Sequence, residues 1–283
     1  MLRLASASID RTLQTEAMEQ MDEKGRAVSP KGHGIEFDDV RFSYENKEIL
    51  HGISVKLQDK TTTAVIGPSG SGKTTLCNLI ARFWDVDSGS VKIGGKDVRE
   101  YTLESLMEQI SMVFQNVYLF ADTIENNIKF GRPQATHEEV VEAARKACCD
   151  DFIEALPDGY DTVIGEGGAS LSGGEKQRIS IARAILKDAP IVILDEATAN
   201  VDPENEDRLQ KAVEELTRNK TIIMIAHRLK TVRNADQILV VDDGRIVQRG
   251  RHEDLIGQKG IYHDFVLGRK EAIGWKLEAQ IVP

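Results

Sequence analysis

The residues best suited to chemistry form one glycine-rich stretch, Gly67-Pro68-Ser69-Gly70-Ser71-Gly72-Lys73-Thr74-Thr75. The apolar run before it predicts a strand, and the segment after it predicts a helix. Glycines at this spacing let successive backbone N–H groups turn toward an anion, and the start of the helix adds its dipole. Lys73 can reach the outer phosphates of a bound nucleotide, and the Thr74 hydroxyl can ligate Mg²⁺. We therefore expect this loop to bind a nucleoside triphosphate.

Two adjacent carboxylates, Asp195 and Glu196, end a second apolar run at residues 191–194. The run is continuous and β-branched, which is typical of a strand buried on both faces. Ligands of open α/β sheets gather at the carboxyl ends of the strands, so we expect Asp195 to hold Mg²⁺ across from Thr74. Glu196 points to a different side, and we expect it to orient or deprotonate the attacking water.

A second possible anion site begins at Ser172, which is followed by Gly173 and Gly174. The serine is predicted to cap the start of a helix, where a hydroxyl and exposed N–H groups can bind an anion. The chain has no second phosphate loop for this site to serve. The sequence therefore predicts two separate phosphate-binding helix starts.

Alternating strands and helices are predicted to position these residues. Strands are expected at residues 35–42, 53–57, 63–66, 91–93, 110–114, 191–194, 221–226 and 237–241, with a hairpin-like turn at 242–244. Helices are expected at residues 1 to about 24, 76–83, 103–109, 137–149, 151–156 and 173–186, and from about residue 204. This alternation is typical of a largely parallel sheet.

The composition excludes several classes of protein. The net charge of −10 argues against a broadly basic surface that grips nucleic acid. No apolar run reaches the length of a membrane span, and the three cysteines show no zinc-binding spacing. We expect reduced thiols in a cytosolic compartment.

Taken together, the motifs resemble the nucleotide-binding domain of an ABC transporter over residues 35–268. The segment 171–175 resembles the LSGGQ signature of that family, with Glu175 in place of the usual glutamine. The resemblance implies an α/β fold, namely a P-loop NTPase (RecA-like) core with an antiparallel β subdomain and an inserted α-helical subdomain at about 116–187. It places the nucleotide-binding domain at 35–270, a helix and linker from the cytoplasmic end of a missing transmembrane domain at 1–34, and a tail at 271–283.

The resemblance also assigns four further residues. Tyr44 resembles the aromatic residue that stacks on adenine, and Gln115 resembles the glutamine that contacts Mg²⁺ or the attacking water near the membrane partner. Asp202 resembles the aspartate of the D-loop, and His227 resembles the switch histidine. The implied ligands are ATP and Mg²⁺.

The family geometry implies a head-to-tail dimer in which Ser172 and Gly174 of one copy clamp the γ-phosphate held by the other. Segments 120–128, 155–160 and 162–168 are similar to those of ABC exporters. We therefore expect the C-terminal part of a half-transporter, soluble when isolated, that works at the cytoplasmic face of the cell membrane as a homodimer or heterodimer.

Three alternatives belong to other functional classes. A DNA-repair or chromosome-organising ATPase would carry a long coiled coil between the phosphate loop and the signature, and residues 76–170 show no heptads. A translation-associated protein would carry two such domains, whereas this sequence has one phosphate loop. A binding module without catalysis would be expected to lack Glu196 or His227, and both are present.

Overall fold

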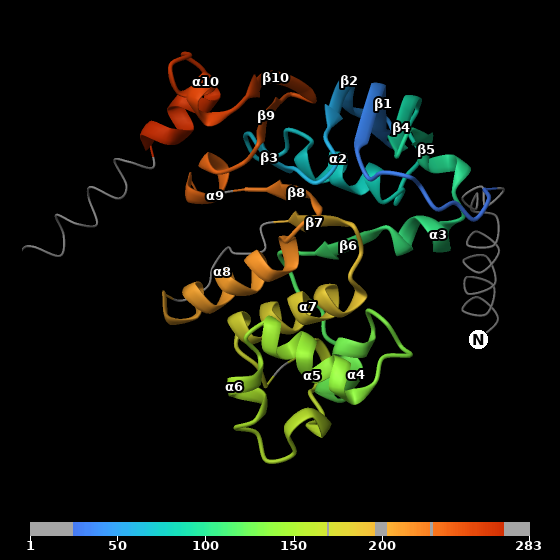
Figure 1. Cartoon of the computed structure of the whole chain (residues 1–283). Coiled ribbons are helices and arrows are strands. Elements are labelled where there is room, and N and C mark those ends of the chain that lie inside the picture. The colour runs from blue at the N-terminus through green and yellow to red at the C-terminus, as the bar shows by residue number, and fades with distance from the viewer. Residues whose placement is uncertain (1–24, 169, 196–202, 227–228, 269–283) are drawn as a thin grey trace, which may run out of the picture.

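Two β-sheets and a group of helices make up the fold (Figure 1). The computed structural model describes residues 25–168, 170–195, 203–226 and 229–268. The predicted helix at 1–24 and the tail at 271–283 lie outside the described residues. Within these ranges, no helix is both long and apolar enough to cross a membrane.

The larger sheet has six strands in the order β10-β9-β3-β8-β7-β6. They are β3 (Thr62–Ile66), β6 (Ile110–Val113), β7 (Ile191–Asp195), β8 (Thr221–Ile225), β9 (Gln237–Asp242) and β10 (Arg245–Gly250). All neighbouring pairs are parallel except β9 with β10, which are antiparallel. The predicted turn between β9 and β10 is confirmed: Asp243 and Gly244 have φ angles of 40° and 67°, as a two-residue hairpin turn requires.

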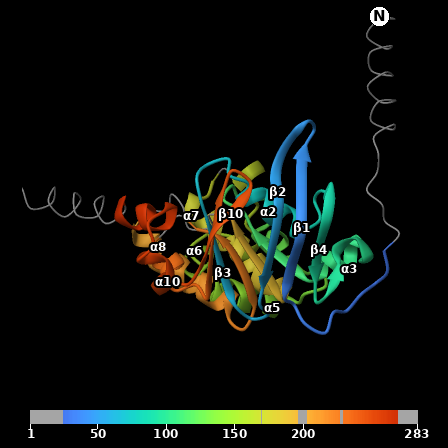
Figure 2. The ribbon, with the colours of Figure 1, turned by 90° about the horizontal axis from the view of Figure 1, so that it is seen from above.

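The smaller sheet is antiparallel, with the order β2-β1-β4-β5. Its strands are β1 (Ile35–Tyr44), β2 (Lys47–Leu57), β4 (Ser88–Ile93) and β5 (Lys96–Asp97). Figure 2 shows β1, β2 and β4 side by side. Strand β2 is six residues longer than predicted at its start. Register shifts in its pairing with β1, and Gly52 with a φ of 85°, interrupt the alternation that the prediction relied on.

Two apolar cores lie on opposite faces of the larger sheet. Successive side chains of a strand point to opposite faces, so Ala64 enters one core and Val65 the other. The same division separates Val192 from Ile193 in β7. The prediction that residues 191–194 form a strand buried on both faces is confirmed.

The helices cover these two faces. They are α2 (Lys73–Ile80), α3 (Leu103–Glu108), α4 (Ile124–Lys129), α5 (His137–Lys146), α6 (Asp150–Ile153), α7 (Gly173–Lys187), α8 (Pro203–Thr217), α9 (Leu229–Arg233) and α10 (His252–Ile256). Helix α2 contacts β4 of one sheet and β8 of the other, so it joins the two sheets. In Figure 1, α4, α5 and α6 gather on the side of α7 that faces away from the strands. The α/β core with an antiparallel sheet and a helical group confirms the predicted fold class.

Candidate nucleotide-binding site

The glycine-rich loop links β3 to α2 with a backbone that favours glycine. Gly67, Gly70 and Gly72 have φ angles of 150°, 78° and 102°. A Cβ atom on Gly67 would lie 1.9 Å from the carbonyl oxygen of Val241, whereas one on Gly70 would meet nothing within 4 Å. The loop is therefore pressed against β9 at its start and open at Gly70, as a cradle for a ligand requires.

Lys73 begins α2 directly after Gly72, which caps the helix. Its ammonium donates hydrogen bonds to the carbonyl oxygens of Gly67 and Pro68, at 3.1 and 2.7 Å. The ammonium therefore lies at the loop itself, where it could bind a phosphate with the greater strength of a charged pair. These contacts fit the predicted role of Lys73 as a phosphate ligand.

The pairing of three neighbouring strands places Asp195 at the same edge of the sheet as the loop. Ile225 of β8 pairs with Val65 on one side and with Asp195 on the other. Adjacent strands lie about 4.8 Å apart, so Asp195 is roughly 10 Å from the end of β3. Burial raises the pKa of the Cys77 thiol in α2, and the negative charge of Asp195 raises it further. The Asp195 carboxylate is therefore close enough to α2 to act on Cys77 electrostatically.

Thr74 and Asp195 therefore offer a hydroxyl and a carboxylate at one edge of the sheet. Thr74 is exposed in the first turn of α2, and Asp195 is half-buried at the end of β7. Oxygen donors of this kind, completed by water, fit Mg²⁺. Three predicted site residues, Glu196, Asp202 and His227, lie outside the described residues.

Gln115 follows β6 at the same edge, because Val113 pairs with Leu194 of β7. The side chain of Gln115 is exposed. The amide of Gln177 in α7 donates a hydrogen bond of 3.3 Å to the carbonyl oxygen of Phe114. The segment that carries Gln115 is thus tied to the helix that begins at Ser172.

Ser172 caps α7, which confirms the predicted helix start. Its hydroxyl oxygen accepts the N–H of Glu175 at 3.3 Å, and the Glu175 carboxylate accepts the N–H of Ser172 at 2.7 Å. This capping box uses one acceptor site of the hydroxyl and leaves its O–H able to donate. Gly173 is exposed, and a Cβ atom there would meet nothing within 4 Å. The start of α7 is thus accessible to an anion, although Glu175 adds a negative charge beside it.

Tyr44 is the last residue of β1 and is half-buried. Its ring lies 4.8 Å from the Phe42 ring and 5.4 Å from the Trp84 ring, measured between centroids, and is perpendicular to both. Trp84 follows α2, the helix that begins at Lys73. The sequence assigned no role to Trp84.

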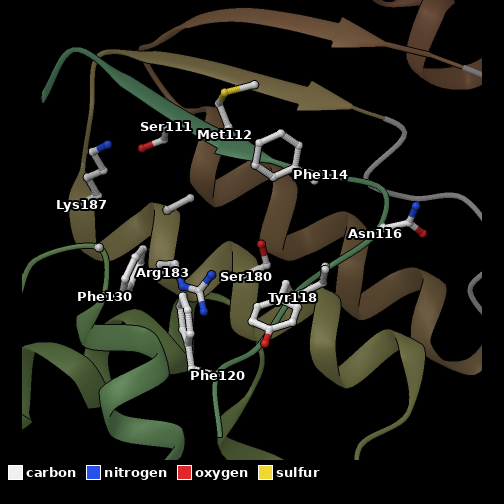
Figure 3. A pocket seen from close by; sticks show the side chains of 13 residues that line it. Ser111, Met112, Phe114, Asn116, Tyr118, Phe120, Phe130, Ser180, Arg183 and Lys187 are labelled. Atoms are coloured by element: carbon white, nitrogen blue, oxygen red, sulfur yellow. The ribbon is translucent and has the colours of Figure 1, made fainter. Parts of the chain in front are cut away.

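A groove beside Gln115 was also missed from the sequence (Figure 3). It has a volume of about 300 Å³ and lies between the segment after β6 and helix α7. Its aromatic lining consists of Phe114, Tyr118, Phe120 and Phe130, which are all exposed. Phe130 is 62% exposed, which is unusual for a side chain of this size. The recurrence of aromatic residues over 114–130 was the signal available in the sequence.

Two cations, Arg183 and Lys187, also line the groove. The Arg183 guanidinium lies 5.9 Å from the Phe120 ring and 5.3 Å from the Phe130 ring, and Figure 3 shows it beside both. Its Nε atom donates to the carbonyl oxygen of Asn127 at 2.8 Å, and Lys187 Nζ donates to that of Ile110 at 2.7 Å. Burial lowers the pKa of both side chains. The groove therefore combines an apolar lining with positive charge.

Comparisons with known proteins show which family this chain resembles. A family model described as "ABC transporter" matches residues 50–199, which are 150 of the 283 residues. The ATP-dependent lipid A-core flippase of Desulfotalea psychrophila is 52% identical over 245 residues, covering 86% of this chain and 43% of that protein. The flippase of the same name in Escherichia coli (strain K12) is 49% identical over 248 residues, with the same two coverages.

A solved structure of a bacterial Atm1-family ABC exporter with ATP bound is also similar, with a TM-score of 0.86 and 39% identity. The match covers 94% of this chain and 47% of that one. The chain therefore spans less than half the length of these relatives.

Proposed function

We propose that this chain, which belongs to the ABC transporter family, binds and hydrolyses ATP to drive export through a transmembrane part. The observation that carries the proposal is the placement of Lys73 and Asp195 at the same edge of the larger sheet. A cradle for phosphates beside a metal-binding carboxylate is the arrangement that a triphosphate with Mg²⁺ needs. The names of the relatives, two flippases and an exporter, favour transport over an ATPase of DNA repair or translation.

Each described site residue then has a task. Lys73 binds the outer phosphates together with the backbone N–H groups that the glycine-rich loop offers at the residues other than Pro68, and Tyr44 stacks on the adenine. Thr74 and Asp195 would hold Mg²⁺, which neutralises phosphate charge when bound. Gln115 would contact Mg²⁺ or the attacking water, from a segment that also borders the groove.

Three further residues, Glu196, Asp202 and His227, complete the proposed ATP site. Glu196 orients or deprotonates the attacking water, and His227 holds the γ-phosphate. Asp202 lies in the segment that would face the partner copy. These assignments rest on the family resemblance and on the position of each residue in the sequence.

A second copy of the chain supplies the other half of the site in this proposal. Ser172 and Gly173 are exposed at the start of α7, and Gly174 follows them as a buried residue. In a head-to-tail dimer they would bind the γ-phosphate that Lys73 of the first copy holds. Loss of that phosphate after hydrolysis would remove the shared charge and open the dimer.

The groove beside Gln115 is the proposed contact with the transmembrane part. Exposed rings and the cations Arg183 and Lys187 suit a short amphipathic segment. The groove borders the segment that carries Gln115. That segment is hydrogen-bonded to α7 through Gln177. Movement in the transmembrane part could thus reach both halves of the ATP site.

The protein would work at the cytoplasmic face of a membrane, and a lipid is the first cargo to test, given the named flippases.

The test is ATPase activity as a function of protein concentration, combined with Glu196→Gln. A dimeric site predicts that activity per chain rises with concentration and that the variant forms an ATP-dependent dimer on gel filtration. Ser172→Ala should weaken that dimer without preventing ATP binding by the monomer. Activity per chain that is independent of concentration, with a monomeric variant at saturating ATP, would refute the shared site. Stimulation by DNA would instead favour the repair-type ATPase.

A further inference from the structure

The Tyr44 ring is placed by a tight hairpin. Tyr44 ends β1 and pairs with Lys47 at the start of β2, across a turn in which Glu45 has a φ of 53°. The backbone of Tyr44 is therefore fixed by strand pairing. The direction of the ring depends on its neighbours, because the side chain lies at the open end of the sheet.

Three aromatic rings meet at this position. The centroids of Phe42 and Tyr44 are 4.8 Å apart, those of Tyr44 and Trp84 are 5.4 Å apart, and those of Phe42 and Trp84 are 6.3 Å apart. Phe42 is buried in the core, whereas Trp84 is 51% exposed. The two contacts of Tyr44 are edge-to-face, a geometry that aromatic pairs favour, whereas Phe42 and Trp84 are tilted by 54°. Tyr44 is thus held by one buried ring and by one ring that reaches it from another element.

Helix α2 delivers Trp84 to this place through a defined turn. The N–H of Phe83 donates to the carbonyl oxygen of Asn78 at 3.0 Å, and that of Arg82 donates to Leu79 at 3.2 Å. This pair of bonds is the Schellman motif, whose left-handed residue is commonly glycine. Here it is Arg82, with a φ of 51°.

The side chain of Arg82 secures that turn. Its Nε and Nη2 atoms donate to the two carboxylate oxygens of Asp85, at 2.8 and 3.2 Å. The Arg82 side chain is 2% exposed, whereas that of Asp85 is 37% exposed, so the ion pair lies at the edge of the core. Trp84 lies between these two residues in the sequence, and its backbone is therefore held from both sides.

We propose that Trp84 is a positioning residue for nucleotide recognition, because it holds the Tyr44 ring in the orientation that stacks on the base. The inference rests on the proposed function, in which Tyr44 binds adenine. One helix would then set both ends of the ligand: α2 begins at Lys73, beside the phosphates, and leads into Trp84, beside the base platform. Removing Trp84 should weaken recognition of the base and leave recognition of the phosphates unchanged.

A double-mutant cycle measured by titration calorimetry tests this. Trp84→Ala should weaken ATP binding about 3- to 10-fold, the range expected for loss of one perpendicular ring contact. Inorganic tripolyphosphate, which has no base, should bind the variant within about 2-fold of the wild type. Trp84→Phe should restore most of the ATP affinity. Trp84→Ala should cause no further loss in a Tyr44→Ala background, because it acts through that ring.

The control is Phe83→Ala, which removes the adjacent exposed aromatic residue and should leave ATP affinity unchanged. Equal losses for ATP and tripolyphosphate, or additive losses in the double variant, would overturn the proposal, because Trp84 would then act on the phosphate loop or independently of Tyr44. An effect of Tyr44→Ala with none of Trp84→Ala would also overturn it and leave the proposed function intact. Failure of the wild-type chain to bind ATP would refute the proposed function itself. Thermal unfolding of each variant establishes that it is folded.

Discussion

The carboxylate of Glu175 accepts the N–H of Ser172 at 2.7 Å, where the related signature has a glutamine. The negative charge stabilises the start of α7, because it faces the positive end of the helix dipole. The same charge disfavours a second anion at this helix start. Glu175 therefore raises the stability of the helix and lowers the affinity of the helix start for phosphate.

Replacing Glu175 separates these two effects. Glu175→Gln keeps an acceptor for the N–H of Ser172, so the free energy of unfolding should change by less than about 0.5 kcal/mol. The ATP-dependent dimer should become tighter, because the repulsion is removed. Glu175→Ala also removes the repulsion but should lower stability by about 1 kcal/mol through loss of the cap. Urea unfolding and sedimentation velocity with ATP measure the two quantities. A weaker dimer in both variants would show that Glu175 itself contributes to the interface.

At the scale of an element, the phosphate loop depends on Gly67 and Gly70 for different reasons. Gly67→Ala would place a Cβ atom 1.9 Å from the Val241 carbonyl oxygen, a backbone atom that cannot move without distorting β9. We expect this variant to lose more than about 3 kcal/mol of stability or to fail to fold. Gly70→Ala meets only the strain of its φ of 78°, which costs about 1 kcal/mol. Similar urea midpoints for the two variants would contradict this difference.

An acidic residue of α6 links α7 to α8. Asp151 in α6 forms ion pairs with Arg178 of α7 and Arg208 of α8, whose side chains are 2% and 52% exposed. Asp151→Ala would leave the buried Arg178 guanidinium without its carboxylate partner. The guanidinium would keep its hydrogen bond of 2.6 Å to the carbonyl oxygen of Cys148. We expect a loss of about 2–3 kcal/mol in unfolding free energy. The control Arg208→Ala removes only the exposed partner and should cost less than about 0.5 kcal/mol.

The elements that the sequence predicted correctly are those determined by local pattern. The apolar run at 191–194 must be buried on both faces whatever surrounds it, and Ser172 with Glu175 forms its cap within four residues. Helix α4 was not predicted individually, because six residues are too few to show a helical period, although Thr123 caps it and it packs on α7. The groove brings Phe120 next to Arg183, and no local signal predicts a contact across 63 positions. Trp84 was missed for the same reason, since its contact with Tyr44 joins two separate elements.

At the scale of the whole molecule, the net charge of −10 opposes the dimer that the site requires. Two such chains repel each other at low ionic strength, where charges act over roughly 30 Å at 0.01 M salt compared with about 8 Å at 0.15 M. Binding of ATP to one chain has the opposite dependence, because the phosphates meet Lys73 and the positive end of α2. The two steps of assembly should therefore respond to salt with opposite signs.

We expect dimerisation of Glu196→Gln at saturating ATP and Mg²⁺ to strengthen several-fold between about 0.02 and 0.2 M sodium chloride. Sedimentation velocity over a range of protein concentrations measures this step. Calorimetric titration of ATP into the monomer, at protein concentrations below the dimerisation range, serves as the control and should show weaker binding over the same range of salt. Dimerisation that weakens with salt would contradict the argument, because exposed ion pairs across the interface would then outweigh the repulsion between the two acidic chains.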